Sequence, residues 1–278
     1  MFQFIANIFG YLLEWLYNGI GQNYGIALIL FTIILRIILL PLTIKQQKSM
    51  KKTTELQGKM QEIQFKYKNN PELMNKEIMD LYKRENLSPF SGCISSIVQI
   101  LIILSVFYLV SRPLTYMKKI DPGIIENYRN EISAENDGKI SNYYEIEIIQ
   151  KKAAQDENIK VNMDFLGLDL SKVPSQNMTD IKVYIIPMLY VISSIFSIRM
   201  TTGKTKKKEQ NGSSEPDMTQ QMNKSMSYMM PIMAVSIAFV APLGLALYWL
   251  ISNILMILER IVINKYVDSK EEKTLCLK

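Results

Sequence analysis

The sequence predicts an all-α polytopic membrane protein with five transmembrane helices, an N-terminal amphipathic interfacial helix and a cytoplasmic helical hairpin. Nearly half of the 278 residues are apolar, and the charged residues avoid long stretches of the chain while crowding the stretches between them. The uncharged runs cover residues 24–44, apart from Arg36, and residues 91–111, 183–198 and 225–258. Since about 20 residues of apolar helix cross a hydrocarbon core of roughly 30 Å, each run is long enough, or nearly so, to span a membrane.

Residues 1–20 are expected to form an amphipathic helix that lies in the membrane interface. Apolar side chains recur at helical spacing along it, and Tyr11 and Trp15 add interfacial aromatic rings. The apolar stripe consists of Phe2, Ile5, Phe9, Leu12 and Leu16. No Lys or Arg precedes Arg36, so the basic region of a secretory signal peptide is missing and the segment is expected to be retained.

The last uncharged run is too long for one comfortable span. Ala241-Pro242-Leu243-Gly244 at its centre predicts a tight turn between two spans, because proline removes a backbone donor and glycine adopts turn conformations cheaply. A single kinked helix is the alternative. The expected order is a span at 23–44, the cytoplasmic hairpin at 45–90, a span at 91–111, an extracytoplasmic loop at 112–182, a span at 183–199, a cytoplasmic linker at 200–224, spans at 225–241 and 243–260, and a cytoplasmic tail at 261–278.

Charge counts in the loops predict the orientation. Residues 45–90 carry ten Lys and Arg against six Asp and Glu, and residues 199–227 carry six against three, which is typical of cytoplasmic loops. Residues 112–182 carry ten against twelve, and their external position follows from alternation with the neighbouring loops. The chain is therefore expected in a bacterial cytoplasmic membrane, with its N-terminus outside and its C-terminus in the cytoplasm.

The predicted hairpin contains two short apolar seams on either side of a helix-start signature, Asn70-Pro71. The seams are formed by Leu56, Met60, Ile63 and Tyr67, and by Met74, Ile78 and Leu81. Basic residues lie outside the seams and suit contact with anionic lipid head groups or ribosomal RNA. They are Lys51, Lys52, Lys59, Lys66 and Lys68. A solvated arm with no partner is the alternative interpretation.

Arg36 is the most informative residue, because it lies about 12 residues into its span, well inside the hydrocarbon at about 1.5 Å per residue. A guanidinium cannot lose its charge there, and it costs about 2.5 to 3.5 kcal/mol at a helix centre. The predicted spans contain no Asp or Glu before Glu259, at the cytoplasmic end of the last one, so no counter-charge is expected. The sequence therefore predicts a hydrated pocket, open to one side, with one fixed positive charge.

Other side chains in the spans are candidates for the lining of this pocket. They are Thr32, Gln99, Tyr248, Trp249 and Asn253. The amides are equally suited to interhelical hydrogen bonds, and the two aromatic rings to packing or to the interface. A positively charged pocket would attract an acidic polar segment and draw it partway into the membrane, after which a following apolar segment could move into lipid. This is the physics of a membrane protein insertase.

Few enzyme mechanisms suit this composition. The chain has no histidine and two cysteines in unrelated contexts, and it has no phosphate-binding loop pattern, so neither a metal site, a cofactor nor a catalytic residue is expected. A membrane enzyme is also disfavoured because Ser193 and Ser194 lack a basic partner. The main rival is an anion-binding secondary transporter or channel, since a buried arginine can also bind a small anion, although no internal repeat is visible.

The chain resembles the YidC/Oxa family of membrane protein insertases, in particular the five-span form of Gram-positive bacteria, over nearly its whole length. Single motifs are weak, but their order is specific. The matching stretches are Tyr24-Gly25-Ile26-Ala27, Arg36, Leu40-Pro41-Leu42, Lys45-Gln46, Lys48-Ser49-Met50, Leu81-Tyr82-Lys83, Gly92-Cys93, Gln99, Met229-Met230-Pro231, Pro242-Leu243-Gly244-Leu245, Leu247-Tyr248-Trp249 and Ser252-Asn253. The external loop is longer than the five-span form leads one to expect, and the lipoprotein-type leader common in such members is not visible.

The resemblance implies a hydrophilic groove within the membrane that is closed to the outside, open to cytoplasm and lipid, and faced by Arg36. It also implies that Trp249 and Asn253 line the groove and that the hairpin near residues 46–85 receives substrates. The expected partners are nascent membrane proteins and the lipid bilayer, with the ribosome and the Sec translocon as further candidates. No DNA is expected, and a monomer is expected to be the working unit.

Overall fold

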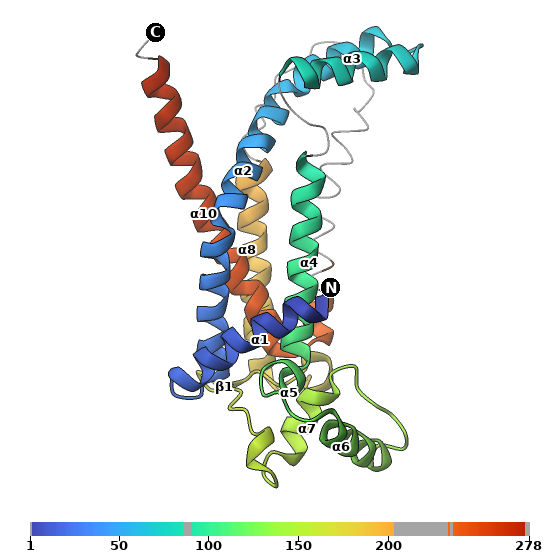
Figure 1. Cartoon of the computed structure of the whole chain (residues 1–278), viewed down its shortest axis with the longest axis vertical. Coiled ribbons are helices and arrows are strands. Elements are labelled where there is room, and N and C mark those ends of the chain that lie inside the picture. Colours follow the sequence, from blue (N-terminus) through green and yellow to red (C-terminus); the bar gives the residue numbers. More distant parts are fainter. Residues whose placement is uncertain (1, 86–90, 203–232, 234–235, 276–278) are drawn as a thin grey trace. The chain divides into compact units, whose positions relative to one another are not determined.

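The computed structural model describes residues 2–85, 91–202, 233 and 236–275, which are mostly helical (Figure 1). The α-helices are α1 (Phe2–Gly19), α2 (Tyr24–Lys66), α3 (Pro71–Arg84), α4 (Ser91–Ser111), α5 (Pro113–Tyr116), α6 (Pro122–Glu135), α7 (Tyr144–Lys152), α8 (Ile185–Thr202) and α10 (Leu243–Leu275). Three 3-10 helices, η1 (Glu157–Ile159), η2 (Pro174–Gln176) and η3 (Ile181–Tyr184), and two strands, β1 (Asp164–Phe165) and β2 (Leu168–Asp169), complete these elements.

Within the described residues, three helical stretches are long and apolar enough to cross a membrane, Tyr24–Ser49, Ile181–Met200 and Leu243–Ile263. A shorter apolar stretch, Ile97–Ser111, belongs to α4. The chain is therefore an all-α polytopic membrane protein, apart from one small β-hairpin that the sequence did not predict. The predicted span at 225–241 and the predicted linker at 200–224 fall largely outside the described residues.

The chain divides into two compact units. The first unit contains residues 1–36 and 105–278, and the second contains residues 37–104. In the second unit, α2 continues without a break past the predicted end of the first span. The start of α3 is as predicted, because Pro71 occupies the first turn and the Asn70 side chain accepts a hydrogen bond from the Leu73 N–H. A salt bridge of 2.8 Å joins Lys59 of α2 to Glu85, which caps α3.

Helix α1 is present, but its predicted apolar stripe does not form its exposed face. Leu16 of the stripe is buried against the protein, together with Ala6, Gly10 and Leu13. The exposed face is apolar as well and is formed by Phe4, Ile8, Tyr11 and Trp15. The periodicity predicted the helix, and because the helix is apolar on most sides, periodicity alone does not show which side packs against the protein.

The predicted turn at Ala241–Gly244 is an interruption between helical residues 236–240 and α10. The segment after β2 caps the start of α10, because the Leu243 and Gly244 N–H groups donate to the carbonyls of Lys172 and Leu170, at 2.9 Å each. The segment before β1 also reaches α2, where the Tyr24 N–H donates to the Asn162 carbonyl at 3.0 Å. Backbone carbonyls thus satisfy N–H groups that have no partner within their own helix.

Residues 113–184, most of which the sequence predicts to be an extracytoplasmic loop and which are called the external region below, contain short helices and two strands. Helices α6 and α7 pack together through Ile125, Ile132, Ile146 and Ile149, all buried. Glu145 of α7 is fully buried and accepts hydrogen bonds from the Thr115 backbone N–H at 2.9 Å and from the Thr115 hydroxyl at 2.6 Å. This carboxylate therefore ties α7 to the short helix α5.

We expect the stability of this external region to depend on pH through Glu145. Burial raises the pKa of the Glu145 carboxyl above its ordinary value, although the hydrogen bonds from Thr115 oppose the shift. The folded state therefore binds a proton at pH values where the unfolded chain has already lost it, so stability should be greater in acid and fall as pH rises through the raised pKa. Thermal unfolding of the wild type and Glu145→Gln between about pH 4 and about pH 8 tests this. The variant should lose this part of the pH dependence, and an identical pH profile would contradict the assignment.

Candidate functional site

Arg36 of α2 contacts α10 within the first unit. Its Nη2 donates a hydrogen bond to the Ser252 carbonyl oxygen at 3.0 Å, and its Nη1 lies 3.7 Å from Oε2 of Glu259. The side chains of Arg36 and Glu259 are 16% and 11% exposed, so both charges are largely shielded by the protein. Ser252 and Glu259 lie about two turns apart on one face of α10. Helix carbonyls point toward the C-terminus and side chains lean toward the N-terminus, so these two oxygens converge on one guanidinium.

The predicted absence of a counter-charge is therefore wrong. The sequence places Glu259 near the end of the last span, and α10 continues as an unbroken helix that brings this carboxylate to Arg36. The pairing lowers the cost of holding a guanidinium within a membrane-spanning helix. At 3.7 Å the contact is electrostatic rather than a hydrogen bond, since N–H···O bonds measure about 2.7–3.2 Å.

Two other predicted residues lie on the helices that meet at Arg36. Thr32 precedes Arg36 by one turn on α2 and is buried, and its hydroxyl donates to the Leu28 carbonyl at 2.6 Å. Tyr248 precedes Ser252 by one turn on α10 and is also buried. Both residues thus lie one turn from the contact between Arg36 and Ser252, and the hydroxyl of Thr32 is already satisfied within its own helix.

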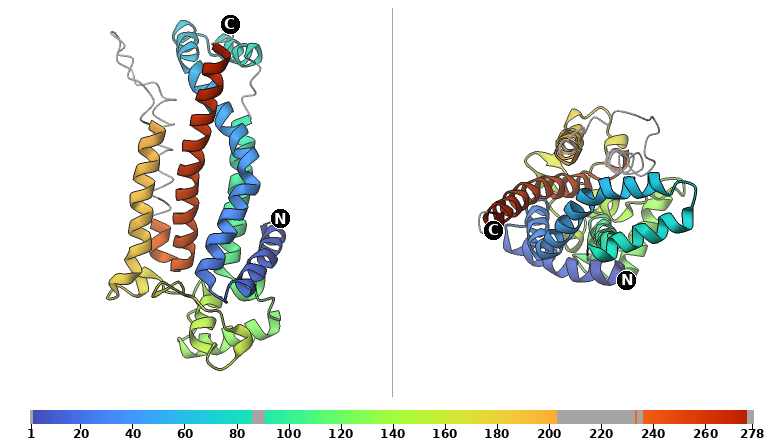
Figure 2. Two further views of the ribbon diagram at one scale, coloured as in Figure 1. Left: turned by 90° about the vertical axis from the view of Figure 1, so that its left-hand side faces the viewer. Right: turned by 90° about the horizontal axis from the view of Figure 1, so that it is seen from above.

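Asn253 and Trp249 face α8 instead. The Asn253 amide nitrogen donates to the hydroxyls of Ser193 at 2.9 Å and Ser194 at 3.3 Å, and the Trp249 ring lies 6.3 Å from the Tyr190 ring. These contacts join α8 and α10, which run side by side (Figure 2). From the sequence, Asn253 was a candidate either for the pocket lining or for interhelical hydrogen bonds. The structure shows the interhelical hydrogen bonds.

Replacing Asn253 by leucine is expected to weaken the packing of α8 on α10 by about 0.6 to 1.7 kcal/mol, the range for interhelical hydrogen bonds in membranes. The change removes both hydrogen bonds and keeps most of the volume. The free energy of unfolding in mixed detergent and lipid micelles measures the effect. Ser194→Ala, which removes only the longer bond, serves as the milder control. Equal stability of Asn253→Leu and the wild type would show that these bonds contribute nothing.

Gln99 and the five predicted lysines belong to the second unit, whereas Arg36 belongs to the first. Gln99 of α4 is half-buried. Lys52, Lys59, Lys66 and Lys68 are exposed, and Lys51 is half-buried. Lys59 and Lys66 have local partners, Glu85 and the ring of Tyr67.

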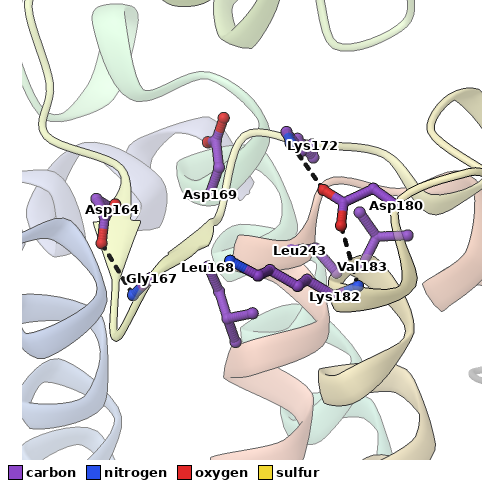
Figure 3. Close-up of a pocket in the computed structure, with 9 residues that line it drawn as sticks. All are labelled: Asp164, Gly167, Leu168, Asp169, Lys172, Asp180, Lys182, Val183 and Leu243. Atoms are coloured by element: carbon purple, nitrogen blue, oxygen red, sulfur yellow. Dashed lines mark hydrogen bonds and ion pairs between the residues drawn. The ribbon is translucent and has the colours of Figure 1, made fainter.

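A hollow of about 190 Å³ lies in the external region beside the start of α10 (Figure 3). Two of its charged groups pair with each other, because Lys172 and Asp180 form a salt bridge of 2.8 Å, and the backbone N–H of Lys182 also donates to Asp180. This pairing lowers the pKa of Asp180 and raises that of Lys172, so both stay ionised at neutral pH. The Asp164 and Asp169 carboxylates accept hydrogen bonds from Gly167 and Ser171. The hollow is thus a structural junction between the β-hairpin and η3.

No cluster of three or more His, Cys, Asp or Glu side chains that could hold a metal ion occurs among the residues that the structure describes. The polar groups near the membrane-spanning helices are instead a guanidinium, a carboxylate, amides and hydroxyls. Such a set can bind a charged or polar peptide segment by ion pairs and hydrogen bonds.

Comparison with known proteins gives one family and many relatives. The model of the family described as "60Kd inner membrane protein" matches residues 15–271. A protein of Treponema denticola named "Membrane protein insertase YidC" is 29% identical over 263 residues, which cover 94% of this chain and 37% of the relative. A protein of the same name from Oceanobacillus iheyensis is 28% identical, over 95% of this chain and 85% of the relative.

A third relative of that name, from Clostridium perfringens, is 44% identical over 91 residues, or 33% of this chain. The chain spans 37% of the Treponema protein and 35% of a similar protein of Geobacter metallireducens, which is 29% identical. The similarity to these two thus covers nearly the whole of this chain and little more than a third of the relative.

Proposed function

Since this chain belongs to the YidC/Oxa family, whose model bears the description 60Kd inner membrane protein, we propose that it is a membrane protein insertase. It receives nascent membrane proteins in a hydrated groove within the bilayer, which is open to cytoplasm and lipid, and helps their helices to insert and fold. The relatives named membrane protein insertase support this function. The chain performs no chemistry on its substrate and needs no cofactor.

The observation that carries the proposal is the position of Arg36. This arginine lies inside a helix long and apolar enough to cross a membrane, and it faces a second such helix, α10. A fixed positive charge there attracts an acidic segment, and the hydrated groove shortens the stretch of hydrocarbon that a polar tail must cross. Transfer of the following apolar helix into lipid then supplies the driving free energy, assisted by the membrane potential. No nucleotide is required.

The groove is proposed to be lined by Arg36, Thr32 and Tyr248, with Gln99, Trp249 and Asn253 as further lining residues. Thr32 and Tyr248 are supported by their position, since each lies one helical turn from the hydrogen bond between Arg36 and Ser252. Asn253 and Trp249 contribute by holding α8 against α10, so that the groove keeps its shape. An amide and an indole N–H at this level also offer hydrogen bonds to a passing polar backbone.

Five spans are proposed, at 23–44, 91–111, 183–199, 225–241 and 243–260, with the N-terminus outside, the C-terminus in the cytoplasm and α1 in the outer interface. The excess of Lys and Arg in residues 45–90 and 199–227 supports this orientation. The exposed Phe4, Tyr11 and Trp15 support an interfacial α1.

Residues 45–90 are proposed to form a cytoplasmic helical hairpin that first contacts substrates. Its exposed lysines suit the anionic surface of the bilayer or ribosomal RNA, and the ribosome and the Sec translocon are the proposed partners. The chain is proposed to work as a monomer in the cytoplasmic membrane of a bacterium.

Complementation of an insertase-depleted bacterial strain tests the function. The wild-type chain should restore growth and the membrane insertion of a single-span test protein with an acidic tail. Saturable uptake of a small anion into vesicles that contain the protein measures the rival function. A chain that reaches the membrane, restores no insertion and takes up an anion would establish an anion transporter or channel instead.

A further inference from the structure

Glu259 occupies the position beside Arg36 that an acidic substrate group would need. Its carboxylate approaches Arg36 to 3.7 Å and, among the residues that the structure describes, its Oε2 is buried without a hydrogen-bond donor. The chain contains tighter ion pairs, such as Lys172 with Asp180 at 2.8 Å, in which charge and hydrogen bond coincide. The pair of Arg36 and Glu259 is therefore an ion pair without a hydrogen bond.

Within the part of the chain that the structure describes, the Arg36 guanidinium also has N–H donors without an acceptor. It carries five N–H donors, and the Ser252 carbonyl accepts from one of them. That carbonyl belongs to the backbone of α10, so this hydrogen bond positions Arg36 even when the Glu259 carboxylate is no longer paired with it. A second carboxylate could thus approach the same guanidinium while Arg36 stays anchored on α10.

From this geometry we propose that Glu259 is a built-in competitor that holds the place of a substrate carboxylate at Arg36. In the resting protein it neutralises the arginine, and an acidic side chain of the incoming segment displaces it. This inference rests on the proposed insertase function and assigns to Glu259 a role in the selection of substrate segments. Glu259 thereby sets how strongly the site prefers acidic segments, since every acidic group must first replace an existing ion pair.

Removal of the competing charge should sharpen the preference for acidic segments. With Glu259→Gln, an acidic segment meets an unpaired guanidinium, whereas a neutral segment gains nothing. The concentration of acidic probe that gives half-maximal insertion should therefore fall about fivefold, a change of about 1 kcal/mol. Glu259→Asp keeps the charge and should behave like the wild type.

The experiment uses the full chain in vesicles of phosphatidylethanolamine and phosphatidylglycerol. Two single-span probes differ only in their tails, one with Asp and Glu and the other with Asn and Gln at the same positions. Protease protection measures insertion as a function of probe concentration. Glu157→Gln, which removes an exposed carboxylate of the external region, is the control for loss of one negative charge.

A fivefold gain for the acidic probe alone in Glu259→Gln, absent from Glu259→Asp and Glu157→Gln, is the expected result. If the wild type inserts both probes and Glu259→Gln leaves their ratio unchanged, the competitor role is overturned while the insertase function stands. If the wild type inserts neither probe, the proposed function fails and the inference fails with it. A loss of insertion of both probes in a folded Glu259→Gln protein would also overturn the competitor role, because the carboxylate would then be required.

Discussion

Arg36→Ala is expected to reduce the insertion of an acidic-tailed test protein by about tenfold or more, because the interaction of a partly buried charge with its counter-charge is on the order of a few kcal/mol. The variant removes the positive charge from the membrane-spanning region and leaves the Ser252 carbonyl and Glu259 without their common partner. Arg36→Lys keeps the charge and loses the planar fork, so it should retain a substantial part of the activity. Insertion in the depleted strain, normalised to the amount of each variant in the membrane, measures the effect.

Arg36→Ala also leaves a buried carboxylate unpaired, which by itself destabilises a protein. The double variant Arg36→Ala with Glu259→Ala separates the two effects, since it contains neither charge. If the double variant recovers stability but not insertion, the positive charge is required for function. Recovery of insertion in the double variant would show that Arg36→Ala acts only through the unpaired Glu259.

Gly10→Ala is expected to displace α1 from the external region, because a Cβ atom at this position would lie 1.8 Å from the Tyr116 carbonyl oxygen. A methyl group cannot occupy that space unless the backbone of α1 or α5 moves. Alanine favours a helix over glycine by about 0.5–1 kcal/mol, whereas overpacking of this kind costs about 1–3 kcal/mol and occasionally more. The net loss should be about 1 kcal/mol or more.

Gly19→Ala is the matched control, since Gly19 belongs to the same helix and a Cβ atom there meets nothing within 4 Å. It should be neutral or slightly stabilising. Hydrogen exchange of α1 and α5 in lipid vesicles measures both variants, and faster exchange is expected in Gly10→Ala alone. Unchanged exchange in Gly10→Ala would contradict the close approach of α1 to Tyr116.

Short sequence patterns were sufficient to predict several features of the fold. The start of α3 follows from Asn70 and Pro71, and the interruption before α10 follows from Ala241 and Pro242. In both cases the backbone preference of a few consecutive residues decides the structure. The membrane-spanning stretches follow from length and apolar composition, which need no tertiary information.

Contacts between residues far apart in the chain were not predictable. Arg36 and Glu259 are separated by 223 residues, and only the packing of α10 against α2 brings them together. The burial of Glu145 depends likewise on α5, and its sequence context gives no sign that two groups of Thr115 bind it. The two-residue strands of the β-hairpin are too short to show an alternating pattern.

Site-specific photocross-linking tests whether a nascent membrane protein occupies the membrane-spanning site beside Arg36. Met256 is half-buried and lies between Ser252 and Glu259 on the same face of α10, whereas Leu258 is 52% exposed on the opposite face. With a photoreactive residue at position 256, a stalled nascent chain should cross-link to the protein, and position 258 should give little product. Cross-linking at position 258 without cross-linking at position 256 would contradict the account.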